Sequence, residues 1–417
     1  MNRVLLTDQD FSKPAYRIMS APLTISDNNA TVDQALRTME NSGISHLPLS
    51  DITGMIMGLV HKSDINGAVL YSIAFIESGI DKAHDVSELV SLFTEFSRHL
   101  GIMARKQVDP GTIGSSLASV SDRITRRLIA FSIDSAGPPP VDFAFIALGS
   151  EARMEQSFAT DQDNAIIYAD IPESETGKVQ AYFNRLGEIV CEHLNTIGFH
   201  YCKGRIMASN PRWNKPLGTW KHYFSQWAAI TEPKNMMEIS IFFDMRTIYG
   251  SEPFVDELRR HIEIITSGNG SFFFNLAESV LSVRPLVGLT GGLHTEKLED
   301  KELLDLKAAL TPFIMFGRIY SIRHKIRLTN TTGRFQSLQA MQVLPPAVCR
   351  ELLFGYHLLM QIRYRNQAGQ IEKGEVAGNT LDLQELPDAE VSLLKKIITA
   401  TTAMQNQLNI DFKRSVL

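Results

Sequence analysis

The stretch FIALGSEARME at residues 145–155, followed by TDQD at 160–163, indicates the fold of this 417-residue chain. Its apolar start predicts a buried strand, after which Gly149 allows the backbone to turn sharply and approach a ligand closely. Ser150 then stands where a helix begins, so its hydroxyl and the free amides of the first turn suit an anionic phosphate. Arg153, one turn further on, can reach the same anion.

Two aspartates follow at the start of a second predicted strand. Asp161 and Asp163 are two residues apart, so a strand that continues through residues 165–168 places both carboxylates on one face. Paired carboxylates on a rigid strand form a hard oxygen site, suited to Mg²⁺ or Mn²⁺ that bridges triphosphate oxygens. We therefore predict a metal site at Asp161 and Asp163.

Two-metal phosphoryl chemistry usually requires a third carboxylate. Asp244 is the candidate, because it directly follows a predicted strand at 239–243, and it would act as a metal ligand or as the general base for an acceptor hydroxyl. The plainer alternative is that Ser150 caps a helix and the aspartates cap a turn. A second TDQD, at residues 7–10, has no Gly-Ser turn before it, so we predict no metal chemistry there.

The composition excludes several other classes of protein. With 44% hydrophobic and 21% charged residues the chain can form folded cores, and its net charge of −5 argues against a general nucleic-acid binder. Its three cysteines form no CxxC pair, which fits a reducing cytosol better than a zinc site. The sequence has no apolar run of about 18 residues and no signal-peptide pattern, so we expect a cytoplasmic protein without a membrane span.

Apolar periodicity and helix breakers divide the chain into four regions. Short β-rich runs with one helix come first, a helical stretch follows, and GPPP at 137–140 introduces alternating strands and helices before a mostly helical end. The predicted regions are 1–68, 69–137, 138–255 and 256–417, with helices at 32–41, 179–194, 303–327, 348–365 and 388–408. The fold class is α/β plus all-α, with a mixed-sheet core.

The segment GSEARMEQSFATDQDNAIIYAD (149–170) looks like the core of the nucleotidyltransferase superfamily, which is marked by Gly-Ser and Asp-x-Asp. Together with GPPPVDFAFIALGS (137–150), CKGRIMASNPRW (202–213) and ISIFFDMRTIYG (239–250), it resembles the nucleotidyltransferase-like proteins related to PII protein uridylyltransferase. In that family the core follows CBS modules and precedes an all-helical domain to which substrate binding is attributed. The resemblance covers nearly the whole chain.

This resemblance implies roles for the residues quoted above. Asp161 and Asp163 would bind metal, Gly149 and Ser150 would contact the triphosphate, and Asp244 would have an acidic role. The chain departs from many relatives at Ala152, where they have Gly before the Arg, and a helix tolerates Ala there. Residues 69–137 would form a helical linker between the CBS region and the core at 138–255, and residues 256–417 the substrate-binding domain.

The implied reaction is Mg²⁺-dependent transfer of a nucleoside monophosphate from UTP or ATP to an acceptor hydroxyl, with a protein as the favoured acceptor. Two alternatives stay open. A degenerate transferase would only sense nucleotides and signal to a partner. An enzyme of the same fold could instead modify a small molecule such as an antibiotic, although a regulatory CBS region suits signalling better.

Residues 31–64 resemble a CBS module. The resemblance is carried by MSAP (19–22), the helix at 32–41, SHLPL (45–49) and GLVHKSD (58–64). The opening VLLTDQD (4–10) looks like the closing strand and helix start of a preceding module, so we expect the chain to begin inside a CBS pair. Partial CBS units often complete their fold with another chain, which makes a homodimer the expected state.

In CBS modules a Thr or Ser three residues before an Asp holds the phosphate and ribose of an adenine nucleotide. Thr7 with Asp10 matches that spacing, and His61 with Asp64 matches it with His in place of the hydroxyl residue. The chemistry is sensible, since a helix start suits a phosphate and a carboxylate suits a ribose diol. The alternative is that Asp10 and Asp64 only cap helices.

Basic residues occur in two further places. The loop-like stretch after residue 200 contains Lys203, Arg205, Asn210 and Arg212, which would hold the triphosphate or the acceptor, or would simply form a solvated loop. The predicted helix at 303–327 contains Arg318, Arg323, His324, Lys325 and Arg327. Its members four apart, at 323 and 327, share a face that either closes the triphosphate site opposite Ser150 or faces solvent. Trp213, Trp220 and Trp227 recur every seven residues, which favours core packing over base stacking.

Overall fold

The structure is a computed structural model that describes residues 14, 22–51, 53–159, 161–230, 236–237, 239–282, 286, 292–298 and 301–413. The chain divides into two compact units, residues 1–75 and 76–417. We refer to them as the N-terminal and C-terminal units. Within the described ranges, no helix has the length and apolar character needed to cross a lipid bilayer.

The N-terminal unit contains a three-stranded sheet in the order β1-β2-β3, with β1 and β2 parallel and β2 and β3 antiparallel. Its helix packs on β2 through Ala35 and Met39, which are buried. This confirms the helix predicted at 32–41 and the short β-rich runs predicted around it. The elements are β1 (Ser26–Asp27), α2 (Val32–Asn41), β2 (His46–Ser50), β3 (Ile56–His61) and α3 (Lys62–Lys82), which continues into the second unit.

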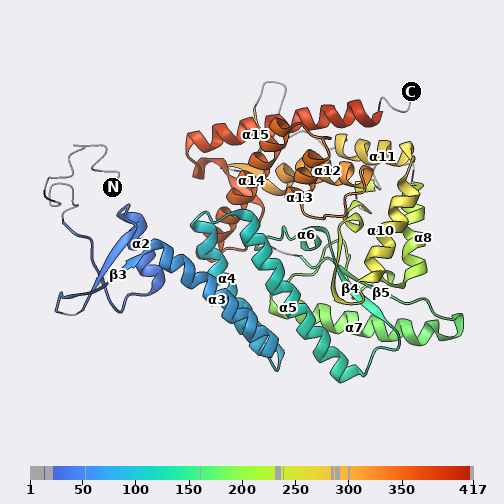
Figure 1. The fold of residues 1–417 in the computed structure, drawn as a ribbon, viewed down its shortest axis with the longest axis horizontal. Coiled ribbons are helices and arrows are strands. Elements are labelled where there is room, and N and C mark those ends of the chain that lie inside the picture. Colours follow the sequence, from blue (N-terminus) through green and yellow to red (C-terminus); the bar gives the residue numbers. More distant parts are fainter. Residues whose placement is uncertain are drawn as a thin grey trace. The chain divides into compact units, whose positions relative to one another are not determined.

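The first part of the C-terminal unit contains two long helices and an α/β core (Figure 1). Its longer elements are α4 (Val86–Arg105), α5 (Pro110–Ala136), β4 (Phe143–Leu148), β5 (Asn164–Tyr168), α7 (Thr176–Ile197), β6 (Asn214–Pro216), α8 (Leu217–Ala228) and β7 (Met245–Gly250). Its shorter ones are α6 (Gly149–Ala152) and the 3₁₀ turns η2 (Glu173–Glu175), η3 (Pro211–Trp213) and η4 (Ser240–Phe243).

Helix α5 illustrates how local sequence sets these boundaries. Asp109 caps its start by accepting a hydrogen bond from the Thr112 amide at 3.1 Å, and Pro110 occupies the first turn, where no amide partner is needed. Gly137, with φ +86°, ends it. The helix packs against α7, α14 and β7, so this part of the predicted linker folds with the core.

The core sheet has the order β6-β5-β4-β7. The central strand β4, FAFIAL, is buried along its whole length and pairs antiparallel with both β5 and β7. Its last residues, Ala147 and Leu148, lie opposite Asn164 and Met245. The residues that follow β4 and those that precede β5 and β7 therefore meet at one end of the sheet.

The strand predicted at 239–243 is wrong. Residues 240–243 form the 3₁₀ turn η4, and the strand is β7, which begins after Asp244 rather than ending before it. A short apolar run cannot by itself distinguish strand from helix. Here the run is a turn because Phe242 packs against Trp213 and Trp227, with ring centroids 4.5 and 4.8 Å apart.

The tryptophans confirm the predicted core role. Trp213, Trp220 and Trp227 are 5%, 1% and 6% exposed, and all three surround Phe242. The indole of Trp220 donates to the Ile166 carbonyl of the core sheet. Their spacing of seven places the last two on one face of α8, which holds that helix against the sheet.

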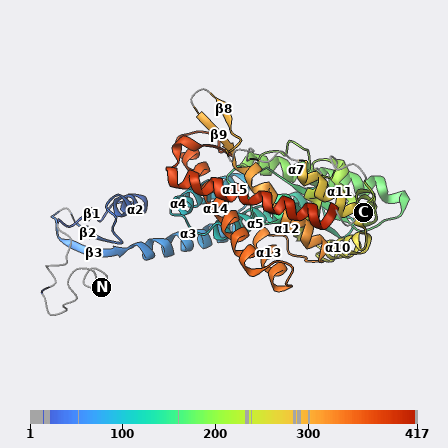
Figure 2. The same ribbon diagram turned by 90° about the horizontal axis from the view of Figure 1, so that it is seen from above.

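The second part of the C-terminal unit is mostly helical, as predicted, and in Figures 1 and 2 α15 runs along α12. Its helices are α10 (Pro253–Thr266), α11 (Gly270–Leu281), α12 (Leu306–Arg323), α13 (Thr331–Ala340), α14 (Pro346–Glu372) and α15 (Asp388–Leu408), followed by the π turn η6 (Asn409–Lys413).

A small antiparallel sheet in this helical region is absent from the prediction. Its strands are β8 (Glu296–Leu298), β9 (Lys301–Asp305) and β10 (Thr380–Asp382), in the order β8-β9-β10, with the 3₁₀ turn η5 (Leu383–Glu385) after them. The predicted helix at 303–327 therefore starts late, because residues 303–305 pair with residues 380–382. Local periodicity cannot reveal a pairing between segments so far apart in sequence.

Candidate functional site

The turn after β4 requires a glycine. Gly149 has φ +55°, and a Cβ at this position would lie 2.8 Å from Cδ1 of Ile241 and 3.2 Å from Oδ2 of Asp163. The turn is fixed on both sides, since the Leu148 amide donates to the Asp163 carbonyl and the Gly149 amide donates to the Asp244 carbonyl. The sharp turn predicted at Gly149 is present, and the predicted approach to a ligand stays a prediction.

Asp161 and Asp163 enter β5 with their carboxylates on the same side. The residue between them, Gln162, is 1% exposed and donates through its side chain to the carbonyls of Cys191 and Phe199. Since neighbouring side chains of an extended segment point to opposite faces, this inward anchor turns Asp161 and Asp163 the other way. Both line a cavity of about 220 Å³.

That cavity lies between the α/β core and the helices α12 and α14. The core contributes Gly149, Ser150, Arg153, Asp161 and Asp163 to its lining. The helical region contributes three cationic residues, Lys307, Arg318 and Arg363, together with apolar residues and Tyr356. The tertiary structure therefore brings the Gly-Ser turn, the aspartate pair and a set of cations to one place.

Asp163 is electrostatically perturbed in this cavity. Burial raises its pKa to about 6, and the charge of Asp161 adds to the rise. A hydrogen bond with Cys202 and the charges of Lys307 and Arg153 act in the opposite direction. A partly buried carboxylate beside a second carboxylate is a place where a bound cation would be stabilised.

The donor set fits Mg²⁺ with two protein carboxylates. Among the described residues, no group of three or more His, Cys, Asp or Glu side chains is placed to hold a metal ion. Mg²⁺ is commonly bound through one or two carboxylates plus phosphates and water, so Asp161 and Asp163 suffice for a substrate-bridged ion.

Asp244 does not lie where the metal hypothesis places it. It is fully buried and outside the lining of the cavity. Its Oδ2 accepts from Arg153 at 2.7 Å and from Arg318 at 2.5 Å, and its Oδ1 accepts from Arg334 at 2.5 Å. Burial alone would raise the pKa of Asp244, but the charges of Arg318, Arg334 and Arg153 outweigh it and hold that pKa below its usual range.

Arg153 lines the cavity, as the prediction of anion contact requires, but its guanidinium also forms two ion pairs within the protein. Its Nε donates to Glu155 at 2.7 Å and its Nη1 to Asp244. Glu155 in turn accepts from the Thr331 amide at the start of α13, at 2.5 Å. These contacts join the core to the helical region and fix the orientation of the Arg153 guanidinium.

The basic loop after residue 200 lies beside the cavity. Cys202 contacts the Asp163 carboxylate, while Lys203 and Arg205 are exposed and absent from the cavity lining. The backbone of Arg205, with φ +54°, accepts from the side chains of Asn210 and Trp213 at 3.0 Å. The guanidinium of Arg212 lies 4.7 Å over the Trp213 ring. The loop is ordered by these contacts, and the side chains of Lys203 and Arg205 are exposed.

The predicted shared face of Arg323 and Arg327 is wrong. Helix α12 ends at Arg323, because Lys325 adopts a φ of +58°. Arg323 lies over the Phe273 ring and Arg327 pairs with Glu263. Of the basic cluster at 318–327, Arg318 is the one that lines the cavity. His324 borders a different cavity and Lys325 a third.

Sequence patterns gave no signal for Lys307 and Arg363. Each sits on a helix, where a charged residue is ordinarily solvated, and each lies more than 140 residues from the aspartates it faces. Only the packing of α12 and α14 over the end of the core sheet brings them to the cavity.

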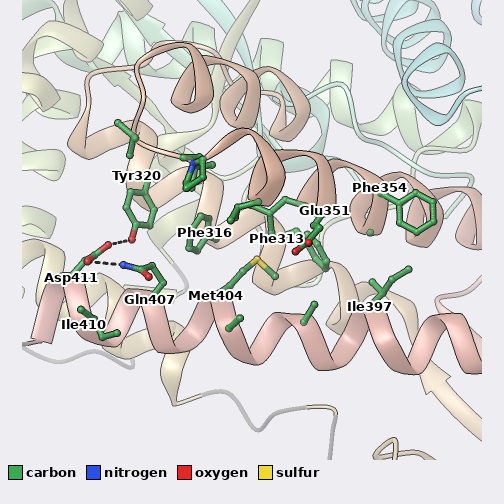
Figure 3. Close-up of a pocket in the computed structure, with 18 of the residues that line it drawn as sticks. Phe313, Phe316, Tyr320, Glu351, Phe354, Ile397, Met404, Gln407, Ile410 and Asp411 are labelled. Carbon is green, nitrogen blue, oxygen red and sulfur yellow. Dashed lines mark hydrogen bonds between the residues drawn. The ribbon is translucent and has the colours of Figure 1, made fainter.

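A larger cavity, of about 1010 Å³, lies where α15 packs along α12 and α14 (Figure 3). Phe313, Phe316 and Met404 line its middle, and at one end Asp411 accepts from Tyr320 and Gln407. Its lining is largely apolar and includes neither Asp161 nor Asp163.

Glu151, next to Ser150, is a buried acid whose pKa rises to about 8, chiefly through burial and then through the charge of Asp122. Because this pKa exceeds the ordinary value of 4.5, the folded state binds the proton more tightly than the unfolded state. Stability should therefore fall as pH rises from 4.5 to about 8.

We expect Glu151→Gln to flatten that dependence. The variant should match wild type near pH 5 and unfold at a higher temperature above pH 8, as followed by thermal denaturation from pH 5 to 9. Glu188→Gln, a change at an exposed glutamate on α7, is the control, and it should follow the wild-type curve. A Glu151→Gln curve parallel to wild type throughout would show that Glu151 is ionised in the folded protein.

In the N-terminal unit, the His61 amide donates to Oδ2 of Asp64 at 3.1 Å, in the first turn of α3. The ring of His61 packs against that of His46, with centroids 4.3 Å apart. The amide contact is the helix-capping arrangement, so ligand binding at His61 and Asp64 stays a prediction. Thr7 and Asp10 lie outside the described residues.

Comparison with known families gives three matches. Residues 94–234 match the family described as "Putative nucleotidyltransferase DUF294", and residues 270–412 match "Putative nucleotidyltransferase substrate binding domain". Residues 15–71 match the CBS domain. No curated protein matches the chain. Both of the first two matched regions contribute to the cavity lining. Asp161 and Asp163 belong to residues 94–234, and Lys307, Arg318 and Arg363 belong to residues 270–412.

Proposed function

Because the chain belongs to the CBS-domain-containing family of putative nucleotidyltransferases, we propose that it is a Mg²⁺-dependent enzyme that transfers a nucleoside monophosphate from UTP or ATP to an acceptor hydroxyl. The acceptor we favour is a protein, as in the uridylyltransferases of PII proteins that the sequence resembles. The observation that carries the proposal is the single cavity that joins the Gly149–Ser150 turn, Asp161, Asp163 and four cationic side chains.

Each side of this cavity suits one part of a nucleoside triphosphate. Asp161 and Asp163 would hold Mg²⁺, which when bound neutralises phosphate charge and orients the triphosphate. The backbone at Gly149 and the hydroxyl of Ser150 would contact phosphate oxygens. Arg318 and Lys307, facing them from α12, would bind the remaining phosphates.

The chemistry then depends on position and charge. The acceptor hydroxyl attacks the α-phosphorus in line, its oxygen forms the new bond to phosphorus, and the bond to the β-phosphate oxygen breaks to release pyrophosphate. The hydroxyl proton passes to solvent or to a carboxylate at the cavity. Catalysis would come from holding the two reactants together and from neutralising the charge that develops on the phosphates.

We assign Lys203 and Arg205 a role outside the cavity rather than in its lining. Cys202 fixes the start of their loop against Asp163, so the two exposed cations lie near the aspartates without lining the cavity. We propose that they guide the acceptor or the outer phosphates.

The N-terminal unit would regulate this reaction. We propose that an adenine nucleotide binds to the CBS module at His61 and Asp64, with Thr7 and Asp10 supplying the second motif. A helix start and a carboxylate are the groups that recognise a phosphate and a ribose diol.

The exposed apolar surface of the N-terminal unit supports the homodimer. Six side chains before and along β3 are 43–65% exposed, which is unusual for a folded module: Leu23, Ile25, Met55, Ile56, Met57 and Leu59. We propose that the CBS module of a second copy covers them. Light scattering at micromolar concentration should give the mass of a dimer, and Leu59→Glu should give a monomer with unchanged secondary structure. A wild-type monomer would contradict the proposal.

The decisive experiment measures transfer of label from α-labelled UTP or ATP into protein, with purified enzyme added to a cell lysate and with Mg²⁺ or EDTA present. The proposal expects a labelled band that requires Mg²⁺ and one of the two nucleotides. Added AMP, ADP or ATP analogue should change the rate of labelling if the CBS module regulates it. Label found only in small molecules would instead identify a small-molecule acceptor.

One observation favours a second candidate, a nucleotide sensor without catalytic activity. Asp244 is sequestered by three arginines, which leaves two acidic groups rather than three for the reaction. Such a sensor would bind UTP or ATP in a calorimeter yet transfer no label to any acceptor. The absence of both binding and transfer would exclude both candidates.

A further inference from the structure

Asp244 forms the centre of a buried ion cluster that joins three parts of the C-terminal unit. Arg153 comes from the residue after α6, Arg318 from α12 and Arg334 from α13. The side chains of these four residues are at most 8% exposed. This carboxylate, 0% exposed, is therefore one of the points at which the core and the helical region are joined.

Both oxygens of this carboxylate are engaged. Oδ2 accepts from Arg153 and Arg318, and Oδ1 accepts from Arg334. Arg318 also donates to the Ser240 hydroxyl at 2.9 Å, which fixes its guanidinium further. Asp244 would have to leave these partners to bind a metal ion, and an uncompensated buried charge is costly.

The cluster carries an excess of positive charge on the side of the cavity. Three guanidinium groups, of Arg153, Arg318 and Arg334, face two carboxylates, of Asp244 and Glu155. Two of the three arginines, Arg153 and Arg318, line the cavity, whereas Asp244 does not. Glu155 lines the cavity as well, so the cluster presents two guanidinium groups and one carboxylate to it, while Asp244, which holds both of these arginines, stays outside the lining.

We propose that Asp244 is a positioning residue that fixes Arg153 and Arg318 opposite Asp161 and Asp163, where they bind the phosphates of the donor that leave as pyrophosphate. This inference rests on the proposed function. It makes the helical region part of the donor site, since Arg318 belongs to α12, and it removes Asp244 from the metal ligands. Rigid, bidentate guanidinium groups match phosphate geometry well, provided that a fixed anion orients them.

The affinity for phosphate compounds, measured with and without metal, distinguishes this positioning role from a role of Asp244 as a metal ligand. Calorimetry would measure the binding of inorganic triphosphate in EDTA, and of UTP and ATP in Mg²⁺, to wild type, Asp244→Asn and the Asp161→Asn/Asp163→Asn variant. We expect Asp244→Asn to weaken binding about tenfold or more under both conditions, the effect of losing well-placed charged hydrogen bonds. Asp161→Asn/Asp163→Asn should remove only the gain that Mg²⁺ provides.

Asp122→Asn is the matched control for loss of a buried ion pair. Asp122 accepts from both terminal nitrogens of Arg246, at 2.5 and 2.9 Å, and does not line the cavity. It should destabilise the fold without changing the affinity for triphosphate. If Asp244→Asn does not fold, Arg318→Lys provides the test instead. Weaker binding of triphosphate by this variant in EDTA supports the proposal, and unchanged binding of triphosphate overturns it.

These results distinguish a failure of the role proposed for Asp244 from a failure of the proposed function. If Asp244→Asn abolishes only the Mg²⁺-dependent gain, Asp244 is a metal ligand and the inference fails while the proposed function stands. Unchanged binding in both conditions also overturns the inference. If wild type binds none of the three probes, the proposed function itself fails.

Discussion

The double substitution Asp161→Asn/Asp163→Asn is expected to lower the rate of nucleotidyl transfer by about three orders of magnitude or more, as loss of a metal-binding carboxylate pair does in phosphoryl transfer. Both carboxylates line the cavity with Ser150, and they are the acidic pair through which Mg²⁺ would reach the triphosphate. The readout is the rate of protein labelling from the α-labelled nucleotide.

The same variant should keep or gain stability. Because burial raises the pKa of Asp163 to about 6, the folded protein favours its neutral form, and Asn is neutral. Its thermal unfolding at pH 8 should therefore occur at or above the wild-type temperature, which separates loss of chemistry from loss of fold.

A control on the same strand is available. Asp170 lies beyond the opposite end of β5, is exposed, and accepts from the Gly218 amide at 2.8 Å, an acceptor role that Asn retains. Asp170→Asn removes one carboxylate charge near the strand and should label at the wild-type rate. Labelling by the Asp161→Asn/Asp163→Asn variant at more than about a tenth of the wild-type rate would contradict a metal role for these carboxylates.

Gly149→Ala is expected to have the second largest effect, about a hundredfold loss of activity, the cost of a misplacement of about 1 Å at a reacting centre. The new Cβ would meet the Ile241 side chain at 2.8 Å and the Asp163 carboxylate at 3.2 Å. Ile241 can move, but the Asp163 carboxylate shifts from its place beside the turn. The φ of +55° adds a strain of about 1–2 kcal/mol.

Gly177→Ala provides the comparison. Gly177 lies in the first turn of α7, where an added Cβ meets nothing within 4 Å. It should keep wild-type activity and be slightly stabilised, because Ala favours helix more than Gly does. Steady-state labelling and thermal unfolding of both variants test the claim. A Gly149→Ala enzyme with wild-type activity would show that the turn does not approach the reacting groups.

The local elements were largely predictable because local rules specify them. The strand FAFIAL ends at Leu148, directly before the predicted turn at Gly149, and α15 begins and ends at the predicted Asp388 and Leu408. The failures occur where an element depends on distant partners. Residues 240–243 form a turn because three tryptophans enclose Phe242, and residues 301–305 form a strand because residues 296–298 and 380–382 pair with them.

The candidate site likewise combines features set by neighbouring residues with features set by distant ones. The sequence by itself determined the Gly-Ser turn and the aspartate pair, because a strand end, a glycine and a spacing of two are properties of neighbouring residues. It also determined the family, through motifs confined to short segments.

Only the tertiary structure decided the cationic half of the site and the environment of Asp244. Lys307, Arg318 and Arg363 reach the cavity because α12 and α14 pack over the end of the core sheet. Asp244, Arg153, Arg318 and Arg334 meet across as many as 181 residues of sequence, counted as 334 − 153. An aspartate in a sequence motif looks the same whether its carboxylate faces a metal ion or three guanidinium groups. Its environment depends on which charged groups the packing of distant helices places within hydrogen-bonding distance of the carboxylate.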